Sequence, residues 1–470
     1  MSSNHSRTVQ LSEVYKHDQP EDCWVVLHGV VYDLSEFVKL HPGGAQAILT
    51  VAGTDATKQF AAFHTKEVVK ELSESSVIGV IAGYQPVTEQ DEQGNMDLPP
   101  IQAMMNTADL EAVARRRLRG TTAIDYIDSA ADDEVTHREN GLAFDRVFFR
   151  PKILVNVKEV DTTTPVLGWQ LRMPLYCSSV AANKQYHSEG ELAIARACKK
   201  FGVPYLVPMI SGYPLAEIAR EGGRFWFQLY SSPGTEGRKK VEERVRQAEA
   251  LGGEALFVTV DSPHLGRRER DPYFRNFSKG VGGNLHAANQ KDAEMTWETL
   301  EWFRSITKMK LVLKGIQRSE DAIMAARHGV DAIVISNHGG RQLEFSRATL
   351  VTLQEVVVAL RAVGSNMPVL VDGGIRRGSD VAKAIALGAA AAGLGRTSVF
   401  SLAAYGEDGV SKCLEILEDE FRRTQKLLGA TKVAELTPDL VDARSLGMSV
   451  VATPTRTLYA DQYTPLKSSL

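Results

Sequence analysis

The 470-residue chain contains only four cysteines and no long apolar run, and each scarcity excludes a class of protein. The cysteines, Cys23, Cys177, Cys198 and Cys413, include no CxxC pair. Scattered cysteines of this kind are expected to be reduced thiols rather than a zinc site or a disulfide framework. No apolar stretch reaches the roughly 20 residues that a membrane-spanning helix needs. We therefore expect no membrane span.

The first residues, MSSNHSRTVQLSEV, contain neither the apolar segment of a secretory signal nor the arginines of a transit peptide. The expected location is the cytoplasm for the chain as it stands, or the mitochondrial intermembrane space if a presequence has been removed. The net charge is -4, and residues 1–83 alone carry six Lys and Arg against ten Asp and Glu. An acidic front part disfavours nucleic acid and favours encounter with a basic protein partner.

An acidic stretch divides the chain into two parts. Residues 84–100, YQPVTEQDEQGNMDLPP, are polar and close on two prolines, a composition typical of linkers. The segment 8–83 before it has short strand-like and helix-like runs, which predict a small α+β domain. We expect residues 101–470 to form the second and larger domain.

Eight apolar strand-like runs alternate with amphipathic helix-like stretches in the larger domain. Such a series of β-then-α units predicts an α/β fold, a (β/α)8 TIM barrel. An open doubly wound sheet is the alternative, but no GxGxxG follows the first strand. The expected strands are residues 174–180, 205–211, 225–230, 255–261, 311–316, 332–337, 369–374 and 391–396.

Polar side chains end most of these strands, and a barrel gathers such ends around one mouth. Where AIVISNHGGR closes, His338 can take a proton and the Arg341 fork can hold a carboxylate. Taken singly, each has a structural explanation, such as a helix cap for Asp261 or a snorkelling side chain for Lys314. Together they predict a site for a small organic acid. The set is Ser178, Ser211, Gln228, Tyr230, Asp261, Lys314, His338 and Asp372.

The segments DGGIRRG and GLGR predict an anion site. Backbone N–H groups near Gly374 and Gly395 can cradle a phosphate, with charge from Arg376 and Arg396. Phosphate sites recur after the last two strands of such barrels. Because no Walker signature is present, a phosphate-bearing cofactor is favoured over ATP.

Two histidines in the small domain are candidate metal ligands. His41 lies in the HPGG turn, and His64 follows in AAFHTKEV, flanked by phenylalanines. They are either axial haem ligands or ordinary histidines of a turn and a half-buried face. The segment DCWVVLHGVVYDLSEFVKLHPGG resembles the cytochrome b5 family over most of residues 8–83. That resemblance implies haem b held by His41 and His64, with no coordination position left open, and therefore electron transfer.

Residues 102–470 resemble the FMN-dependent L-2-hydroxy-acid oxidase/dehydrogenase family through DDEVTHREN, FFRPKIL, VTVDSP, GRRERD, KGIQR, SNHGGRQL and DGGIRRG. With a cytochrome b5-like domain in front, the resemblance implies oxidation of an L-2-hydroxy acid, L-lactate to pyruvate foremost. Electrons then pass from FMN through haem b to cytochrome c or a similar acceptor. A homotetramer is also implied. The alternatives are an oxidase that reduces oxygen to hydrogen peroxide and a haem carrier whose barrel is only a scaffold.

The resemblance assigns the reacting groups residue by residue. It implies that His338 is the base that removes a proton and that Asp261 stabilises its imidazolium. Tyr230 bonds the substrate hydroxyl in the same scheme. Lys314 faces one edge of the flavin and stabilises its reduced form.

The resemblance likewise implies which residues bind the substrate carboxylate and the cofactor. Arg341 and Tyr126 hold the carboxylate, with Arg268 in support. The residues implied to hold FMN are Ser178, Ser211, Gln228, Thr259, Lys314, Ser336, Asp372, Gly374, Arg376, Gly395 and Arg396.

Several positions depart from the family pattern. Tyr213 stands where the lactate enzyme has leucine, and we expect it to project toward the substrate's side chain. Ala181 beside it is the usual small residue and leaves room for a short chain. The other departures are Ile127, Ala130, Val180 and Thr397.

Overall fold

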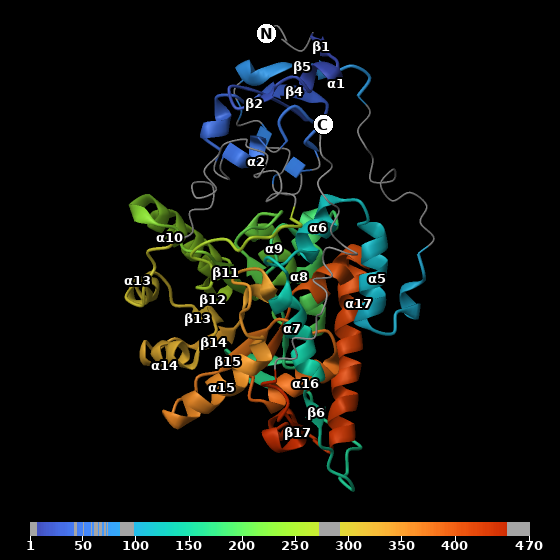
Figure 1. Ribbon diagram of the computed structural model, residues 1–470, viewed down its shortest axis with the longest axis vertical. Coiled ribbons are helices and arrows are strands. Elements are labelled where there is room, and N and C mark those ends of the chain that lie inside the picture. The colour runs from blue at the N-terminus through green and yellow to red at the C-terminus, as the bar shows by residue number, and fades with distance from the viewer. Residues whose placement is uncertain are drawn as a thin grey trace.

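The computed structural model describes residues 7–41, 45–49, 51–57, 59–60, 64, 68–69, 72, 74–84, 98–271 and 292–448. Most of the predicted linker 84–100 and the Pro-Gly-Gly of the HPGG turn lie outside the described residues. So does the chain beyond residue 448. Figure 1 shows the small domain in blue at one end of the molecule, with the larger domain below it.

The small domain is built on a five-stranded sheet in the order β1-β5-β4-β3-β2. Alternating side chains of β3 enter two apolar clusters, one containing Cys23 and Val25 and the other Trp24 and Val26. The two residues between β3 and β4, His28 and Gly29, both have positive φ, which suits a tight two-residue hairpin. The elements are β1 Thr8–Val9, α1 Leu11–Val14, β2 Asp18–Gln19, β3 Asp22–Leu27, β4 Val30–Asp33, α2 Ala45–Leu49 and β5 Val77–Ile81.

The larger domain contains an eight-stranded parallel sheet within its described residues, in the order β10-β11-β12-β13-β14-β15-β16-β9. A parallel bridge between Cys177 and Tyr205 joins its two ends, so the sheet closes. The predicted TIM barrel is confirmed, and the doubly wound alternative is wrong because the strand order never reverses. The strands are β9 Leu175–Cys177, β10 Leu206–Pro208, β11 Phe225–Leu229, β12 Gly253–Thr259, β13 Lys310–Ile316, β14 Ala332–Ile335, β15 Val369–Asp372 and β16 Ala391–Leu394.

Helices follow the strands and surround the barrel (Figure 1). Since both faces of every strand are covered, the strands are continuous apolar runs rather than alternating ones. The helices are α8 Gly190–Phe201, α9 Leu215–Gly222, α10 Gly234–Ala250, α13 Thr299–Ile306, α14 Ser319–Arg327, α15 Thr349–Ala362, α16 Gly378–Ala386 and α17 Arg396–Leu428.

The amino-terminal end of the barrel is plugged by a hairpin. Trp169 of that hairpin packs on Trp226 of β11, with ring centroids 6.1 Å apart. Access is therefore left at the carboxyl ends of the strands, where the predicted polar residues lie. The hairpin strands are β7 Thr164–Val166 and β8 Trp169–Leu171, and a second short pair is β6 Phe148–Phe149 with β17 Val441–Asp442.

Three helices precede the barrel, α5 Thr107–Arg117, α6 Thr122–Asp128 and α7 Val135–Asp145. Helix α5 packs along α17 (Figure 1), which is kinked at Tyr405 and Gly406. At the kink the Tyr405 hydroxyl donates to the carbonyl of Pro99, 2.6 Å away, and so fixes the chain where the larger domain begins. Among the described residues, no helix combines the length and apolar character that crossing a bilayer requires.

Candidate functional site

A histidine, an aspartate and a tyrosine meet at the barrel mouth. His338 follows β14 with a left-handed backbone (φ 59°), a strained conformation that often marks functional sites. Its Nδ1 lies 3.0 Å from Asp261 Oδ1, and its Nε2 lies 3.3 Å from the Tyr230 hydroxyl. The first contact orients the ring and leaves Nε2 toward the cavity side.

The charges of this group favour a neutral imidazole beside an ionised carboxylate. Burial lowers the pKa of His338, although Asp261 opposes the shift. For Asp261, burial alone would raise the pKa, but His338 and then Lys314 bring it below its ordinary value. Burial and the Asp261 charge raise the pKa of Tyr230, so its hydroxyl keeps its proton. At neutral pH His338 is thus ready to accept a proton.

Two arginines next to the dyad form an anion site. Arg268 is 7% exposed, and its Nε donates to the carbonyl of Arg341 at 3.3 Å. Burial and the nearby Arg341 charge lower the pKa of Arg268 to about 10. The Arg341 guanidinium lies 4.9 Å from the centre of the Tyr126 ring. Two cations held this close in a buried place favour a bound anion, as a substrate carboxylate would be.

The active-site arginines also cap a helix, which sequence reasoning missed. The last carbonyls of a helix have no partner within it and attract positive charge. At the end of α6, Arg341 Nη1 donates to the carbonyls of Tyr126 (2.7 Å) and Ser129 (2.8 Å). Arg396 donates to those of Ile127 (2.7 Å) and Ser129 (3.0 Å). The cap fixes Tyr126 next to Arg341.

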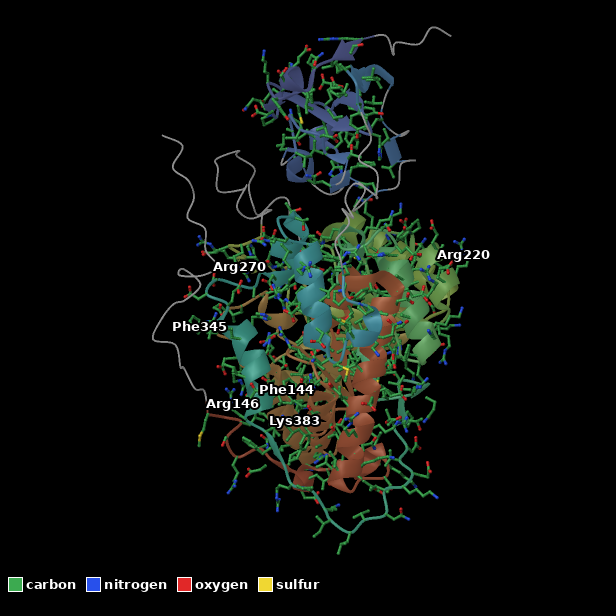
Figure 2. All side chains as sticks on the ribbon, turned by 90° about the vertical axis from the view of Figure 1, so that its right-hand side faces the viewer. Phe144, Arg146, Arg220, Arg270, Phe345 and Lys383 are labelled. Carbon is green, nitrogen blue, oxygen red and sulfur yellow. The ribbon has the colours of Figure 1, made fainter. Side chains whose placement is uncertain are left out.

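Arg270 completes this cap and joins two segments of the mouth. Figure 2 labels it near the end of the barrel that faces the small domain. Its guanidinium bonds both carboxyl oxygens of Glu134, at 2.8 and 2.9 Å. It also bonds the Asp128 carboxylate (3.1 Å) and the Asp128 carbonyl (2.8 Å). The loop of Arg268 is thereby tied to the helix of Tyr126.

Arg270→Ala should lower the free energy of unfolding by about 3–5 kcal/mol, because it removes a partner from buried carboxylates. Urea unfolding measures this. The control is Arg246→Ala, whose exposed pair with Glu242 on α10 should be worth about 0–1 kcal/mol. Equal losses in the two variants would contradict the assigned role of Arg270.

The predicted flavin residues line one wall of the mouth. Lys314 Nζ lies 3.1 Å from Asp372 Oδ2 and donates to Ser336 Oγ at 3.0 Å. Burial alone would lower the pKa of Lys314, but Asp372 and then Asp261 raise it, so the ammonium stays charged. In the described part of the chain, the other oxygen of Asp372 is buried without a hydrogen-bond partner. This wall has the free polar capacity that the edge of a flavin ring requires.

The remaining polar residues continue that wall. Gln228 Nε2 donates to Thr259 Oγ1 at 2.9 Å, which fixes both side chains. Ser211 Oγ donates to the carbonyl of Tyr213 at 2.9 Å. The residues of the predicted flavin set that line the cavity are Ser178, Ser211, Gln228, Thr259, Lys314, Asp372, Gly374, Arg376, Gly395 and Arg396. Ser336 stands behind them, bonded to Lys314.

A second group of residues that suits an anion lies at the carboxyl ends of β15 and β16. Gly395 caps α17 with open space beside it, and the first N–H groups of a helix bind phosphate well. Burial and the Arg341 charge lower the pKa of Arg396 to about 9. His137 of α7 lines the same region and was not predicted. The Arg396 charge, with burial and then Arg376, holds the pKa of His137 far below its ordinary value. The cluster fits a phosphate group.

One sequence expectation is wrong: Tyr213 does not line the cavity. Its hydroxyl donates to the carbonyl of Ser188 at 2.8 Å, and the Lys184 ammonium lies 4.0 Å from the ring centre. These contacts hold the ring away from the mouth. The apolar wall beside the dyad is made instead by Val180, Ala181, Met209 and Ile210.

In the small domain His41 and His64 face each other with ring centroids 5.8 Å apart. Metal–nitrogen bonds to histidine are about 2 Å long, so two rings on one ion have centroids roughly 6 Å apart. Burial and the nearby His41 lower the pKa of His64, which keeps the ring neutral for coordination. The surrounding walls are apolar and suit haem. They are formed by Val25, Leu27, Leu34, Ile48, Val51, Ala56 and Phe60.

A single cavity of about 910 Å³ is lined by this histidine pair and by the barrel mouth. Residues 114–443 match the family described as FMN-dependent dehydrogenase, and residues 10–82 match the cytochrome b5-like heme/steroid binding domain. The chain belongs to the FMN-dependent dehydrogenase family. Its predicted cofactors, FMN and haem b, are confirmed by these two matches. The predicted domain limits remain predictions.

Some relatives match nearly the whole chain, and others match about three quarters of it. The L-lactate dehydrogenases (cytochrome) of Wickerhamomyces anomalus and Saccharomyces cerevisiae are 38% and 39% identical, over 98% of this chain and 84% of each relative. Glycolate oxidase 1 of Zea mays is 40% identical over 74% of this chain and 98% of its own length. The solved flavin-binding domain of baker's yeast flavocytochrome b2 has a TM-score of 0.71 and 41% identity, covering 78% of this chain and 93% of that one.

Proposed function

We propose that this FMN-dependent dehydrogenase oxidises L-lactate to pyruvate and delivers the electrons through haem b to cytochrome c or a similar acceptor. The observation that carries the proposal is the contact of His338 with both Asp261 and Tyr230. His338 and Tyr230 line a cavity that also reaches the His41–His64 pair. A fused haem domain favours one-electron delivery over direct reaction with oxygen.

In this proposal the protein residues handle the proton and FMN, when bound, accepts the electron pair. His338 Nε2 removes a proton from the substrate, and the carboxylate of Asp261 stabilises the imidazolium that results. Tyr230 keeps its proton and hydrogen-bonds the substrate hydroxyl. Lys314 supplies positive charge at the flavin edge.

Arg341 and Tyr126 hold the substrate carboxylate in the proposal, and Arg268 adds a second charge. Because Arg341 already bonds the end of α6, its guanidinium needs no rearrangement when the substrate binds. The proposed FMN residues are Ser178, Ser211, Gln228, Thr259, Lys314 and Ser336 around the ring, and Asp372, Gly374, Arg376, Gly395 and Arg396 at the phosphate end.

Anaerobic mixing with L-lactate, glycolate and longer L-2-hydroxy acids tests the proposal. We expect L-lactate to bleach the flavin band and then raise the reduced haem bands, with fast turnover on ferricytochrome c. Hydrogen peroxide formation in place of cytochrome c reduction would make the protein an oxidase. Light scattering on the same sample tests the homotetramer that the sequence led us to expect.

The wall beside the dyad should set the substrate range. Ala181→Val adds methyl groups inside the cavity, so kcat/KM for longer acids should fall relative to L-lactate by about 10–200-fold. The matched control is Tyr213→Leu, which changes a side chain held away from the cavity by Ser188. It should leave the ranking of substrates unchanged. A ranking changed only by Tyr213→Leu would show that the ring turns inward in solution.

A further inference from the structure

Oxidation of a 2-hydroxy acid to a 2-oxo acid removes two electrons and two protons. When the electrons leave singly through haem, the protons need a separate route to solvent. One of them lies on His338, whether the substrate loses its hydroxyl proton or its α-proton to that base. His338 must therefore be deprotonated in each turnover.

A second, smaller cavity is lined by Tyr230 and Ser262, which both contact His338. Its volume is about 50 Å³, and its polar lining includes Tyr230, Ser231, Thr259, Ser262 and Asp292. Tyr230 and Thr259 also line the large cavity, so they form the wall between the two. A water site needs only about 10–15 Å³ and two or more polar partners, so the small cavity has room for several water molecules.

Each ring nitrogen of His338 lies near a residue that lines the small cavity. Nε2 lies 3.3 Å from the Tyr230 hydroxyl, and Nδ1 lies 3.5 Å from Ser262 Oγ. The Ser262 hydroxyl already has two hydrogen-bond partners: it donates to Asp261 Oδ1 at 3.0 Å and accepts from Gln342 at 3.0 Å. Tyr230 is thus better placed than Ser262 to take a proton from His338.

A carboxylate, Asp292, also lines the small cavity. Ser231 Oγ donates to Asp292 Oδ2 at 2.6 Å, and Asp292 is 8% exposed. A carboxylate that lines a polar cavity and keeps a small exposed fraction can accept a proton from the cavity and release it to solvent.

We propose that the small cavity is the proton exit of the active site, with Tyr230 as the inner relay and Asp292 as the outer proton acceptor. The proposal rests on the proposed function, because only a dehydrogenase of this type must release both protons. The N–H bond at His338 Nε2 breaks as its proton passes to the Tyr230 oxygen. The Tyr230 O–H proton passes to water in the cavity, then to Asp292 and to solvent. No electrons move in these steps, and Tyr230 never becomes charged.

The test uses the FMN- and haem-loaded full chain, L-lactate, and ferricyanide as a one-electron acceptor. Stopped-flow absorbance follows flavin reduction, and a pH indicator in weak buffer follows proton release. Asp292→Asn keeps the shape of the side chain and its ability to accept from Ser231. It should slow proton release and steady-state turnover about tenfold or more, with the first flavin reduction nearly unchanged. Added imidazole should restore the rate.

Asp419→Asn is the matched control, since that carboxylate on α17 is 62% exposed and lines neither cavity. It should leave proton release unchanged. If Asp292→Asn does not hold FMN, Ser231→Val decides instead, because it fills the cavity and leaves the Asp292 carboxylate in place.

Proton release at the wild-type rate in these variants would overturn the proposal and assign the exit to the large cavity. The proposal would also be overturned if flavin reduction slowed by the same factor as proton release and imidazole had no effect, since Asp292 would then be structural. Failure of the proposed function is distinguishable, because then the wild-type flavin would not be bleached by L-lactate.

Discussion

His338→Gln should reduce flavin reduction by L-lactate by about 10²–10⁴-fold, the usual contribution of a positioned base. Glutamine retains a polar side chain near Asp261 and Tyr230 but cannot accept the proton at neutral pH. FMN should stay bound, because the phosphate end lies after β15 and β16 rather than β14. Anaerobic stopped-flow at the flavin band measures the rate, and the flavin content of the purified variant measures binding.

His328→Gln is the matched control. His328 lies at the end of α14, outside the mouth, and stacks on Trp297. It should reduce the flavin at the wild-type rate. If His338→Gln reacted within about tenfold of wild type, another group would have to serve as the base.

His41→Ala and His64→Ala should each abolish the six-coordinate haem spectrum, because each histidine supplies one axial bond. L-lactate should still bleach the flavin in both variants, since the barrel mouth is intact. Reduction of cytochrome c should collapse. Haem absorption, flavin stopped-flow and cytochrome c turnover on one preparation separate the three steps.

The control for these variants is His17→Ala, which removes a histidine of the same domain that stacks on Trp24. Haem binding and cytochrome c reduction should survive this change. Full cytochrome c turnover in a haem-free His41→Ala protein would mean that electrons leave the barrel without the small domain.

The sequence predicted the barrel well because every strand is buried on both faces. Runs such as AIVI and ALFV are apolar on both faces, so each stood out as a strand, and eight of them in β-then-α order left few other folds. The exact ends were less predictable. Asp261 was expected at the end of its strand, but β12 closes at Thr259 and Asp261 lies in the following loop.

A site residue was predictable from sequence when its place at the carboxyl end of a strand is enough to bring it to the barrel mouth. Tyr230, Asp261 and His338 follow β11, β12 and β14, and Lys314 lies within β13, so closure of the sheet brings the four together. Tyr213 was placed wrongly because its direction is set by the Ser188 carbonyl and the Lys184 ammonium, and local sequence shows neither contact.

The arginine cap on α6 could not be predicted for a related reason. The carbonyl of Tyr126 and the guanidinium of Arg341 are 215 residues apart, and every residue type has the same carbonyl. Sequence patterns report side chains, so a site that depends on backbone acceptors leaves no signal. His137 was missed because a lone histidine in a first helical turn is unremarkable until Arg396 is beside it.

The bond from Tyr405 to Pro99 has a kinetic consequence. It fixes the chain at the start of the larger domain, and the 14 residue steps from Tyr84 to Leu98 span at most about 50 Å. A haem domain confined to that radius has an effective concentration on the order of millimolar at the barrel, whatever the dilution. Under the proposed function, electron passage to the haem is therefore first-order, and only the last transfer, to a diffusing acceptor, depends on how often two molecules collide.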